Sequence, residues 1–173
     1  MILPDFEIQH LCEQYKMIDP FNPELLNPAS YDLRLGTGLM TESKEHPHMQ
    51  IEPFAMYSKE SPYMLKPGQF VLADAEPIFN MPEDIAGQFV LKSSRAREGL
   101  QHLLAGFCDP LWSGSRLTLE LKNIRQHHAV AIYPGLRIGQ MVFHMLCGTP
   151  KLKYSEIGHY NNHQSVHQSW EVA

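Results

Sequence analysis

Short runs of alternating apolar and polar residues, separated by Pro, Gly and Asn, fill most of the chain after residue 28. The runs are YDLRLG (31–36), MQIEPF (49–54), YMLKPGQFVLADA (63–75), DIAGQFVLK (84–92), QHLLAGFC (101–108), SRLTLELKN (115–123), HAVAIY (128–133) and LRIGQMVFHML (136–146). A period of two indicates strands, and the intervening segments are too short for the helices of βαβ units. About eight strands at this spacing predict a mainly β fold, either a distorted β-barrel or a jelly roll.

Residues 4–16 predict one short N-terminal helix. Its apolar side chains recur at helical spacing, at Ile8, Leu11, Cys12 and Tyr15. A chain of 173 residues with 43% hydrophobic residues is large enough for one domain, residues 1–173, with a buried core. Residues 151–173 are polar and lack apolar periodicity, so we expect them to form a mobile C-terminal flap.

Charge and composition limit the classes of partner. The formal net charge is −5 and no run of Lys or Arg occurs, which argues against a nucleic-acid polymer as ligand. Neither a signal peptide nor an apolar stretch of membrane-spanning length is found, so we expect a soluble cytoplasmic protein with no membrane partner. Three widely spaced cysteines without a CxxC motif favour reduced thiols over disulfides.

Polar side chains that can carry chemistry concentrate between residues 89 and 123. In RLTLELKN, Glu120 lies on the strand face opposite the leucines, a pattern that by itself is typical of a solvated sheet face. KSSRAREG (92–99) predicts a strand that turns into one helical turn, where N–H groups, hydroxyls and cations can receive an anion. A capped surface turn explains the same residues equally well.

Six segments, in this order, resemble the dCTP deaminase family, which shares a superfamily with trimeric dUTPases and bifunctional dCTP deaminase–dUTPases. The segments are MILPDFEI (1–8), ASYDLRLG (29–36), KSSRAREG (92–99), AGFCDPLWSG (105–114), LTLELKN (117–123) and LRIGQMVF (136–143). The resemblance covers nearly the whole chain. It implies a barrel or jelly roll of dUTPase-like type, a homotrimer with active sites between subunits, and Mg²⁺ bound through the nucleotide triphosphate.

The resemblance also assigns roles to single residues. Glu120 matches the catalytic glutamate, and Ser93 and Arg97 match residues that orient it and the attacking water. The carbonyl of Ala105 resembles the group that holds this water, and Asp109 matches the residue that accepts the sugar 3′-hydroxyl. The other residues matched to the substrate are Lys92, Ser94, Arg95 and Ala96 in the triphosphate turn, Thr118 and Leu119 beside cytosine, Gln140, and Tyr154, His159, Tyr160 and His163 in the tail.

The implied reaction is the hydrolysis of dCTP to dUTP and ammonia. One glutamate can take a proton from water and deliver it to the base and then to the leaving amine. Arg97 is expected to hold Glu120 ionised, because a nearby cation lowers a carboxyl pKa. The H-x-E…P-C-x-x-C signature of zinc deaminases is missing, which argues against zinc. Between Gly114 and Glu120 the chain is one residue longer than the family pattern, which predicts a β-bulge near the site.

Several alternatives stay open at this stage. A dUTPase or bifunctional enzyme would release dUMP, and a non-catalytic trimer would only bind nucleotide; Glu120 in its LTLE context favours deamination over dUTPase activity alone. His159, His163 and His167 recur every four residues, but no carboxylate completes a metal set, so no protein metal site is predicted. His159 and His163 stand where the family has lysine and glutamine, so either Gln164 substitutes through a shifted register or phosphate binding is sensitive to pH. His102 aligns with a pocket wall, where a structural and a catalytic role are equally compatible.

Overall fold

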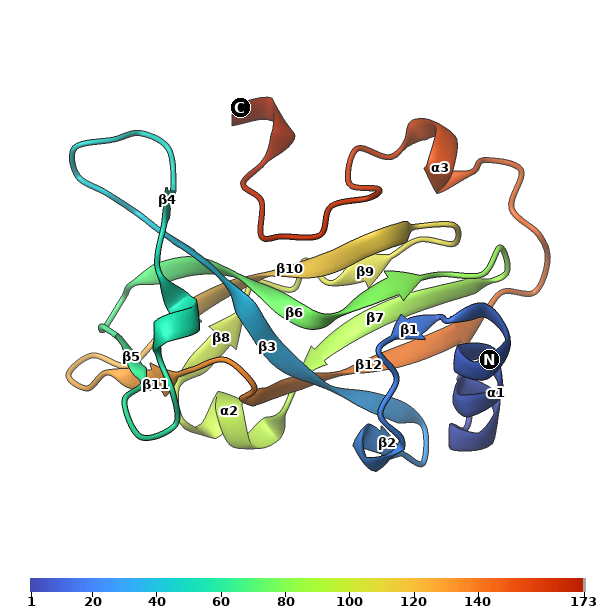
Figure 1. The fold of residues 1–173 in the computed structure, drawn as a ribbon, viewed down its shortest axis with the longest axis horizontal. Coiled ribbons are helices and arrows are strands. Elements are labelled where there is room, and N and C mark those ends of the chain that lie inside the picture. Colours follow the sequence, from blue (N-terminus) through green and yellow to red (C-terminus); the bar gives the residue numbers. More distant parts are fainter. Residues whose placement is uncertain (173) are drawn as a thin grey trace.

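The computed structural model describes residues 1–172 and is built mainly from strands (Figure 1). Its elements are α1 (Asp5–Tyr15), β1 (Ile18–Asp19), η1 (Pro23–Leu25), β2 (Leu26–Asn27), β3 (Ser30–Thr41), β4 (Gln50–Ile51), η2 (Phe54–Met56), β5 (Tyr63–Leu65), β6 (Phe70–Asn80), β7 (Ile85–Leu91), α2 (Ser93–Arg97), β8 (Leu100–His102), β9 (Phe107–Cys108), β10 (Ser113–Asn123), β11 (Val130–Ile132), β12 (Arg137–Met145), α3 (Tyr154–Ile157) and η3 (Trp170–Val172). The predicted mainly β class, the short N-terminal helix and the helical turn after residue 92 are confirmed.

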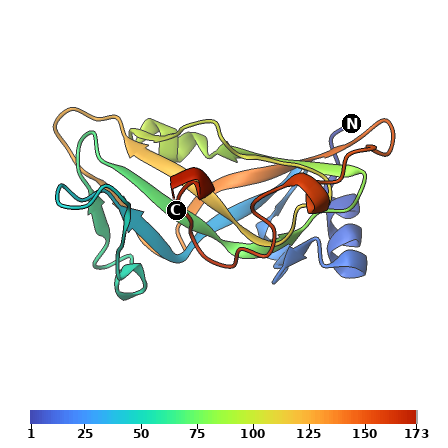
Figure 2. The same ribbon diagram turned by 90° about the horizontal axis from the view of Figure 1, so that it is seen from above.

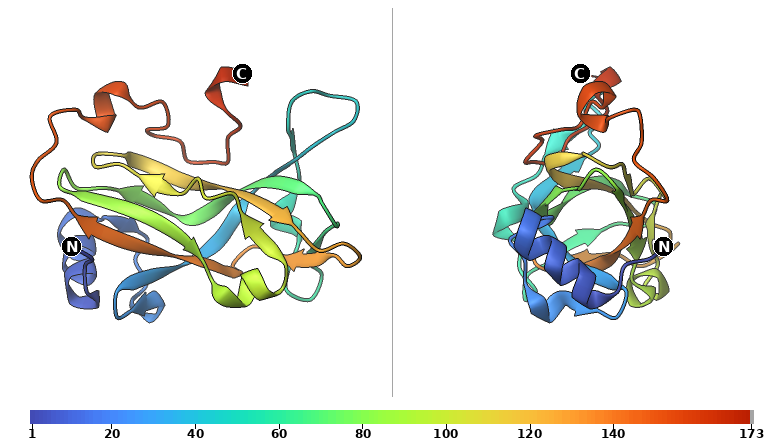
Figure 3. Two further views of the ribbon diagram at one scale, coloured as in Figure 1. Left: turned by 180° about the vertical axis from the view of Figure 1, so that it is seen from behind. Right: turned by 90° about the vertical axis from the view of Figure 1, so that its right-hand side faces the viewer.

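One ten-stranded sheet forms most of the fold. Its main path runs β8-β10-β6-β3-β12-β7-β9, with β1 paired to β6 and with β2 and β4 paired to β3. Strands β11 and β5 make a separate two-stranded sheet. Viewed end-on, the large sheet curls around its own interior, as the right panel of Figure 3 shows. The curl gives the distorted barrel that the strand pattern predicts.

The interior of the curled sheet holds the core. In β10 the three leucines Leu117, Leu119 and Leu121 are buried, whereas Arg116, Thr118, Glu120 and Lys122 between them are partly exposed. The alternation read from the sequence therefore places the leucines in the core and the polar side chains on the opposite face. Aromatic side chains from other strands fill the same core, among them Tyr31, Phe79 and Phe143.

Strand β10 is irregular where it approaches the polar site. Ser113 pairs with Asn80 and Ser115 with Phe79, so Gly114 is an extra residue, and its φ of 65° is one that glycine adopts without strain. This is the β-bulge predicted from the length difference between Gly114 and Glu120. A second shift follows, and here the extra residues lie in β6, between Asp74 and Ile78.

The remaining features of the fold bear on the earlier expectations. Cys12 and Cys108 are buried free thiols and Cys147 is an exposed one. Among the residues that the structure describes, no helix is both long and apolar enough to cross a membrane.

Candidate active site

A pocket of about 690 Å³ lies between the outer face of β10, strand β6 and the C-terminal tail. Its wall includes the polar side chains of Arg116, Thr118 and Glu120 from β10, opposite Phe70 and Leu72 of β6. The remaining lining residues come from the 105–117 segment, from a loop before β4 and from the tail: Ala105, Phe107, Cys108, Asp109, Trp112, Leu117, Pro47, Met49, Tyr154, Tyr160, His163, His167, Gln168 and Ser169. Seven predicted site residues thus share one cavity: Glu120, Ala105, Asp109, Thr118, Tyr154, Tyr160 and His163.

The C-terminal tail passes over β10, as Figures 1 and 2 show, and its residues Tyr154, Tyr160, His163, His167, Gln168 and Ser169 form part of the pocket lining. The carbonyl of Tyr160 accepts hydrogen bonds from Trp112 Nε1 at 2.9 Å and from Ser115 Oγ at 2.7 Å. The amide of Arg116 donates to the carbonyl of His163 at 2.8 Å. The tail is therefore held through backbone groups and polar side chains rather than by core burial, as its composition indicated.

Glu120 is the central carboxyl group of the pocket. Its side chain is 25% exposed, and its Oε2 atom is buried without a hydrogen-bond partner in residues 1–172. Burial raises the pKa of Glu120, because a carboxylate loses solvation when it leaves water. The nearest ionisable partner is His102, whose Nε2 lies 3.6 Å from Glu120 Oε2. A carboxyl group with a raised pKa can both receive and return a proton, as a proton shuttle must.

The triphosphate turn predicted at α2 does not join this pocket within one chain. Figure 1 shows α2 on the side of the sheet away from the tail. Ser93, Ser94, Ala96 and Arg97 are exposed, and Arg95 pairs with Glu98 at 2.7 Å. No hydrogen bond or ion pair joins Ser93 or Arg97 to Glu120 in the described part of the chain. A single chain thus does not supply the cation that we expected beside Glu120.

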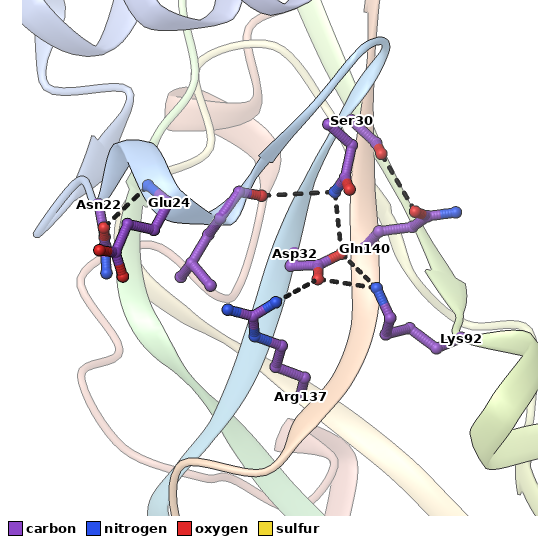
Figure 4. Close-up of polar contacts among 9 residues, drawn as sticks. Asn22, Glu24, Ser30, Asp32, Lys92, Arg137 and Gln140 are labelled. Atoms are coloured by element: carbon purple, nitrogen blue, oxygen red, sulfur yellow. Dashed lines mark hydrogen bonds and ion pairs between the residues drawn. The ribbon is translucent and has the colours of Figure 1, made fainter.

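Lys92, at the start of the same turn, is bound within the chain (Figure 4). Its Nζ donates to both oxygens of Asp32 at 2.6 and 2.7 Å, and Asn27 Nδ2 donates to the same carboxylate at 2.9 Å. Arg137 Nη1 lies 3.6 Å from Asp32 Oδ2. Asp32 is buried, so this network anchors Lys92, the N-cap residue of α2, and neutralises the charge predicted for phosphate binding.

Three other predicted residues also lie outside the pocket lining. Gln140 Oε1 accepts a hydrogen bond from Ser30 Oγ at 3.1 Å, close to the Asp32 network. Leu119 is fully buried in the core. His159 stacks on Trp170 with ring centroids 4.0 Å apart.

Arg116 is a pocket residue that the sequence pattern did not single out. Its Nη1 lies 3.9 Å from Asp74 Oδ2, and its Nε is buried without a hydrogen-bond partner among residues 1–172. Asp74 accepts a hydrogen bond from the Gly38 amide at 2.9 Å, and burial raises the pKa of its carboxyl. The signal was the lone Asp74 within the apolar run FVLADA, because a carboxylate on a buried strand needs a partner.

The histidines of the tail do not form a metal face. His163 and His167 have ring centroids 4.1 Å apart, whereas His159 turns toward Trp170. Within residues 1–172, no group of three or more His, Cys, Asp or Glu side chains is arranged to hold a metal ion.

The sequence matches the dCTP deaminase-like family over residues 2–146, which is most of the chain. This chain belongs to the dCTP deaminase-like family. Relatives of this family member include a protein from Thermobifida fusca, 35% identical over 168 residues, which covers 89% of this chain and 83% of the relative. Another relative, from Tropheryma whipplei, is 34% identical over 165 residues, which covers 89% of this chain and 83% of the relative. Both are named "dCTP deaminase, dUMP-forming".

Solved structures agree with the dCTP deaminase-like fold. A 2′-deoxycytidine 5′-triphosphate deaminase from Agrobacterium tumefaciens superposes with a TM-score of 0.69 at 18% identity, over 90% of this chain and 50% of that one. A dUTPase from Streptococcus mutans superposes with a TM-score of 0.51 at 18% identity, over 76% of this chain and 94% of that one. At this identity the likeness shows the fold alone, which is the dUTPase-like fold that the sequence predicted.

Proposed function

We propose that this family member hydrolyses dCTP and releases dUMP, ammonia and pyrophosphate. The observation that carries the proposal is the pocket in which Glu120, Thr118, Ala105 and Asp109 meet beneath the tail. Relatives named as dUMP-forming support dUMP as the product. The first expectation, dUTP as end product, therefore gives way to the bifunctional alternative.

The first step uses Glu120 as a proton shuttle. Water adds to C4 of cytosine while Glu120 takes one of its protons and delivers it to N3. The Glu120 carboxylate then takes the proton of the new C4 hydroxyl and passes it to the amino group, and ammonia leaves as the C4 carbonyl forms. Burial raises the pKa of Glu120, which favours the protonated form that must act as the acid. Asp109 and Thr118 hold the sugar and the base in this proposal.

The second step replaces the bond between the α- and β-phosphates. A water oxygen attacks the α-phosphorus and its proton is released to solvent, while pyrophosphate leaves with the electron pair of the broken P–O bond. Mg²⁺ bound through the nucleotide triphosphate, as the family resemblance implies, would offset the charge of the leaving group.

A homotrimer completes the site in this proposal. Glu120 and the exposed cation of Arg97 are apart in one chain, so a neighbouring subunit is needed to bring Ser93 and Arg97 to the pocket. Exposed apolar side chains at Val90, Leu103, Leu104 and Phe107, the last of which lines the pocket, support a subunit contact.

Product analysis tests the proposal directly. The protein is incubated with dCTP and Mg²⁺, and dCTP, dUTP, dUMP, ammonia and pyrophosphate are quantified. We expect dUMP and ammonia in equal amounts with little free dUTP. Accumulating dUTP would restrict the activity to deamination, and unchanged dCTP with measurable binding would favour a non-catalytic nucleotide-binding protein. Glu120→Gln is the control, because it keeps the shape of the pocket and removes the shuttle.

A further inference from the structure

His102 lies immediately behind Glu120, outside the pocket lining. It ends β8, where it pairs with Leu121 of β10, and the next amide, that of Leu103, donates to the Glu120 carbonyl at 3.2 Å. The His102 side chain is 4% exposed, so substrate cannot reach it without rearrangement. Any effect of His102 on the reaction must therefore pass through Glu120.

The His102 ring is held in one orientation by its neighbours. Phe89 packs edge-on against it, with centroids 4.7 Å apart and planes at 65°. The backbone of the following loop closes over both rings: a Cβ added at Gly106 would lie 2.6 Å from Phe89 Cβ and 3.2 Å from His102 Cε1. Moreover, the Phe89 amide donates to the Gly106 carbonyl at 2.8 Å, which fixes this loop against β7.

Two unsatisfied polar atoms face each other at this contact. His102 Nε2 and Glu120 Oε2 are both buried, both lack a hydrogen-bond partner in residues 1–172, and lie 3.6 Å apart. Leaving either atom unpaired in the interior is unfavourable, because the atom has lost its hydrogen bonds to water. The distance is longer than a usual N–H···O bond, but hydrogen bonds of catalytic groups are often long without substrate and tighten when it binds.

We propose that His102 is a positioning residue for Glu120: its Nε2–H donates to Oε2, so that Oε1 remains free to face water and cytosine in the pocket. This inference rests on the proposed function. A donor to the carboxylate also favours the ionised form, which the first proton transfer requires. Burial acts in the opposite direction on Glu120, and it lowers the pKa of His102, so the imidazole acts as a neutral donor. His102 thus supplies in one chain part of what we expected from Arg97.

Two neutral amides of different reach test the proposal. In His102→Gln the side-chain amide reaches the position of Nε2, whereas in His102→Asn it stops near the position of Nδ1. We expect His102→Gln to keep the acid limb of the pH profile of kcat/KM, and His102→Asn to move that limb upward by about one pH unit. At pH 7 kcat should fall roughly tenfold or more in His102→Asn with little change in KM.

Other ionisable groups are unchanged in both variants. Those that line the pocket with Glu120 are Cys108, Asp109, Arg116, Tyr154, Tyr160, His163 and His167. If the acid limb of the pH profile of kcat/KM moves only in His102→Asn, the shift therefore reports the contact between His102 and Glu120. Equal profiles in wild type and both variants, or equal losses in both variants without a displaced limb, would show that His102 only packs.

A second measurement keeps the test independent of turnover. The carboxyl ¹³C signal of Glu120 is titrated in the free protein, where a higher pKa in His102→Asn than in wild type and His102→Gln is expected. Unchanged titration in His102→Asn would overturn the proposal. If the pKa of Glu120 is higher in His102→Asn but the wild-type protein does not convert dCTP, the contact between His102 and Glu120 is supported and the proposed function is rejected.

Discussion

Asp32→Asn should lower stability far more than the loss of a surface charge. In the folded protein the Asp32 carboxylate is buried and receives two hydrogen bonds from Lys92 Nζ, at 2.6 and 2.7 Å. Removing one partner of a buried ion pair costs about 3–5 kcal/mol. The Lys92 side chain is 29% exposed and asparagine keeps one acceptor, so we expect a loss at or just below the bottom of this range, about 2–3 kcal/mol. For a chain of 173 residues this corresponds to a fall in Tm of roughly 5–10 °C.

Urea unfolding at a fixed protomer concentration measures this change, since an oligomer makes apparent stability concentration-dependent. Lys92→Met and the double variant complete a double-mutant cycle. The double variant should lose about 1–3 kcal/mol less free energy of unfolding than the two single variants lose in sum. Glu98→Gln is the matched control on the same helical turn: it breaks the Arg95 pair, whose Glu98 side chain is 44% exposed, and should cost at most about 1 kcal/mol. A coupling energy between Asp32 and Lys92 well below about 1 kcal/mol would refute the reasoning.

Further expected outcomes concern catalysis, assembly and the tail. Glu120→Gln should bind dCTP while deaminating it about a thousandfold more slowly or worse, and activity within tenfold of wild type would remove Glu120 from the mechanism. Because burial raises the folded pKa of Glu120, its ionisation opposes folding as pH rises above about 4.3, so the same variant should raise Tm at pH 7 but not at pH 4. Size-exclusion chromatography with light scattering should give the mass of three chains, and an active monomer would contradict this. Removing residues 155–173 should leave a folded protein with a much higher KM for dCTP; in the full chain KM should rise between pH 6 and 8, and His159→Lys should flatten that rise.

The strand pattern was sufficient for the fold class because alternation reports which side of a sheet is buried. Leu117, Leu119 and Leu121 entered the core as their spacing predicted. The extra residue before Glu120 was also sufficient to predict a bulge, which the structure places at Gly114. Strand lengths were less predictable: MQIEPF contributes only the two residues of β4, because the chain leaves the sheet at the 3-10 turn that follows.

In the site, contacts between residues that are close in the sequence could be predicted, whereas contacts between residues far apart in the sequence could not. Residues near one another on β10 and its preceding loop, such as Glu120, Thr118 and Asp109, could be grouped from sequence and do share a pocket. The partner of Lys92 could not, because Asp32 lies 60 residues earlier and meets it only through the pairing of β3 and β7 with β12. The contact between His102 and Glu120 could not be predicted from the sequence either, because it depends on the register in which β8 pairs with β10.

The docked tail gives the protein an internal optical reporter. The chain has two tryptophans. Trp112 donates to the carbonyl of Tyr160 in the tail, whereas Trp170 belongs to the tail and stacks on His159. Release of the tail from β10 would break the Trp112 hydrogen bond and expose its indole to water. Intrinsic fluorescence, excited selectively at tryptophan, should therefore follow opening and closing of the pocket in real time without any added label.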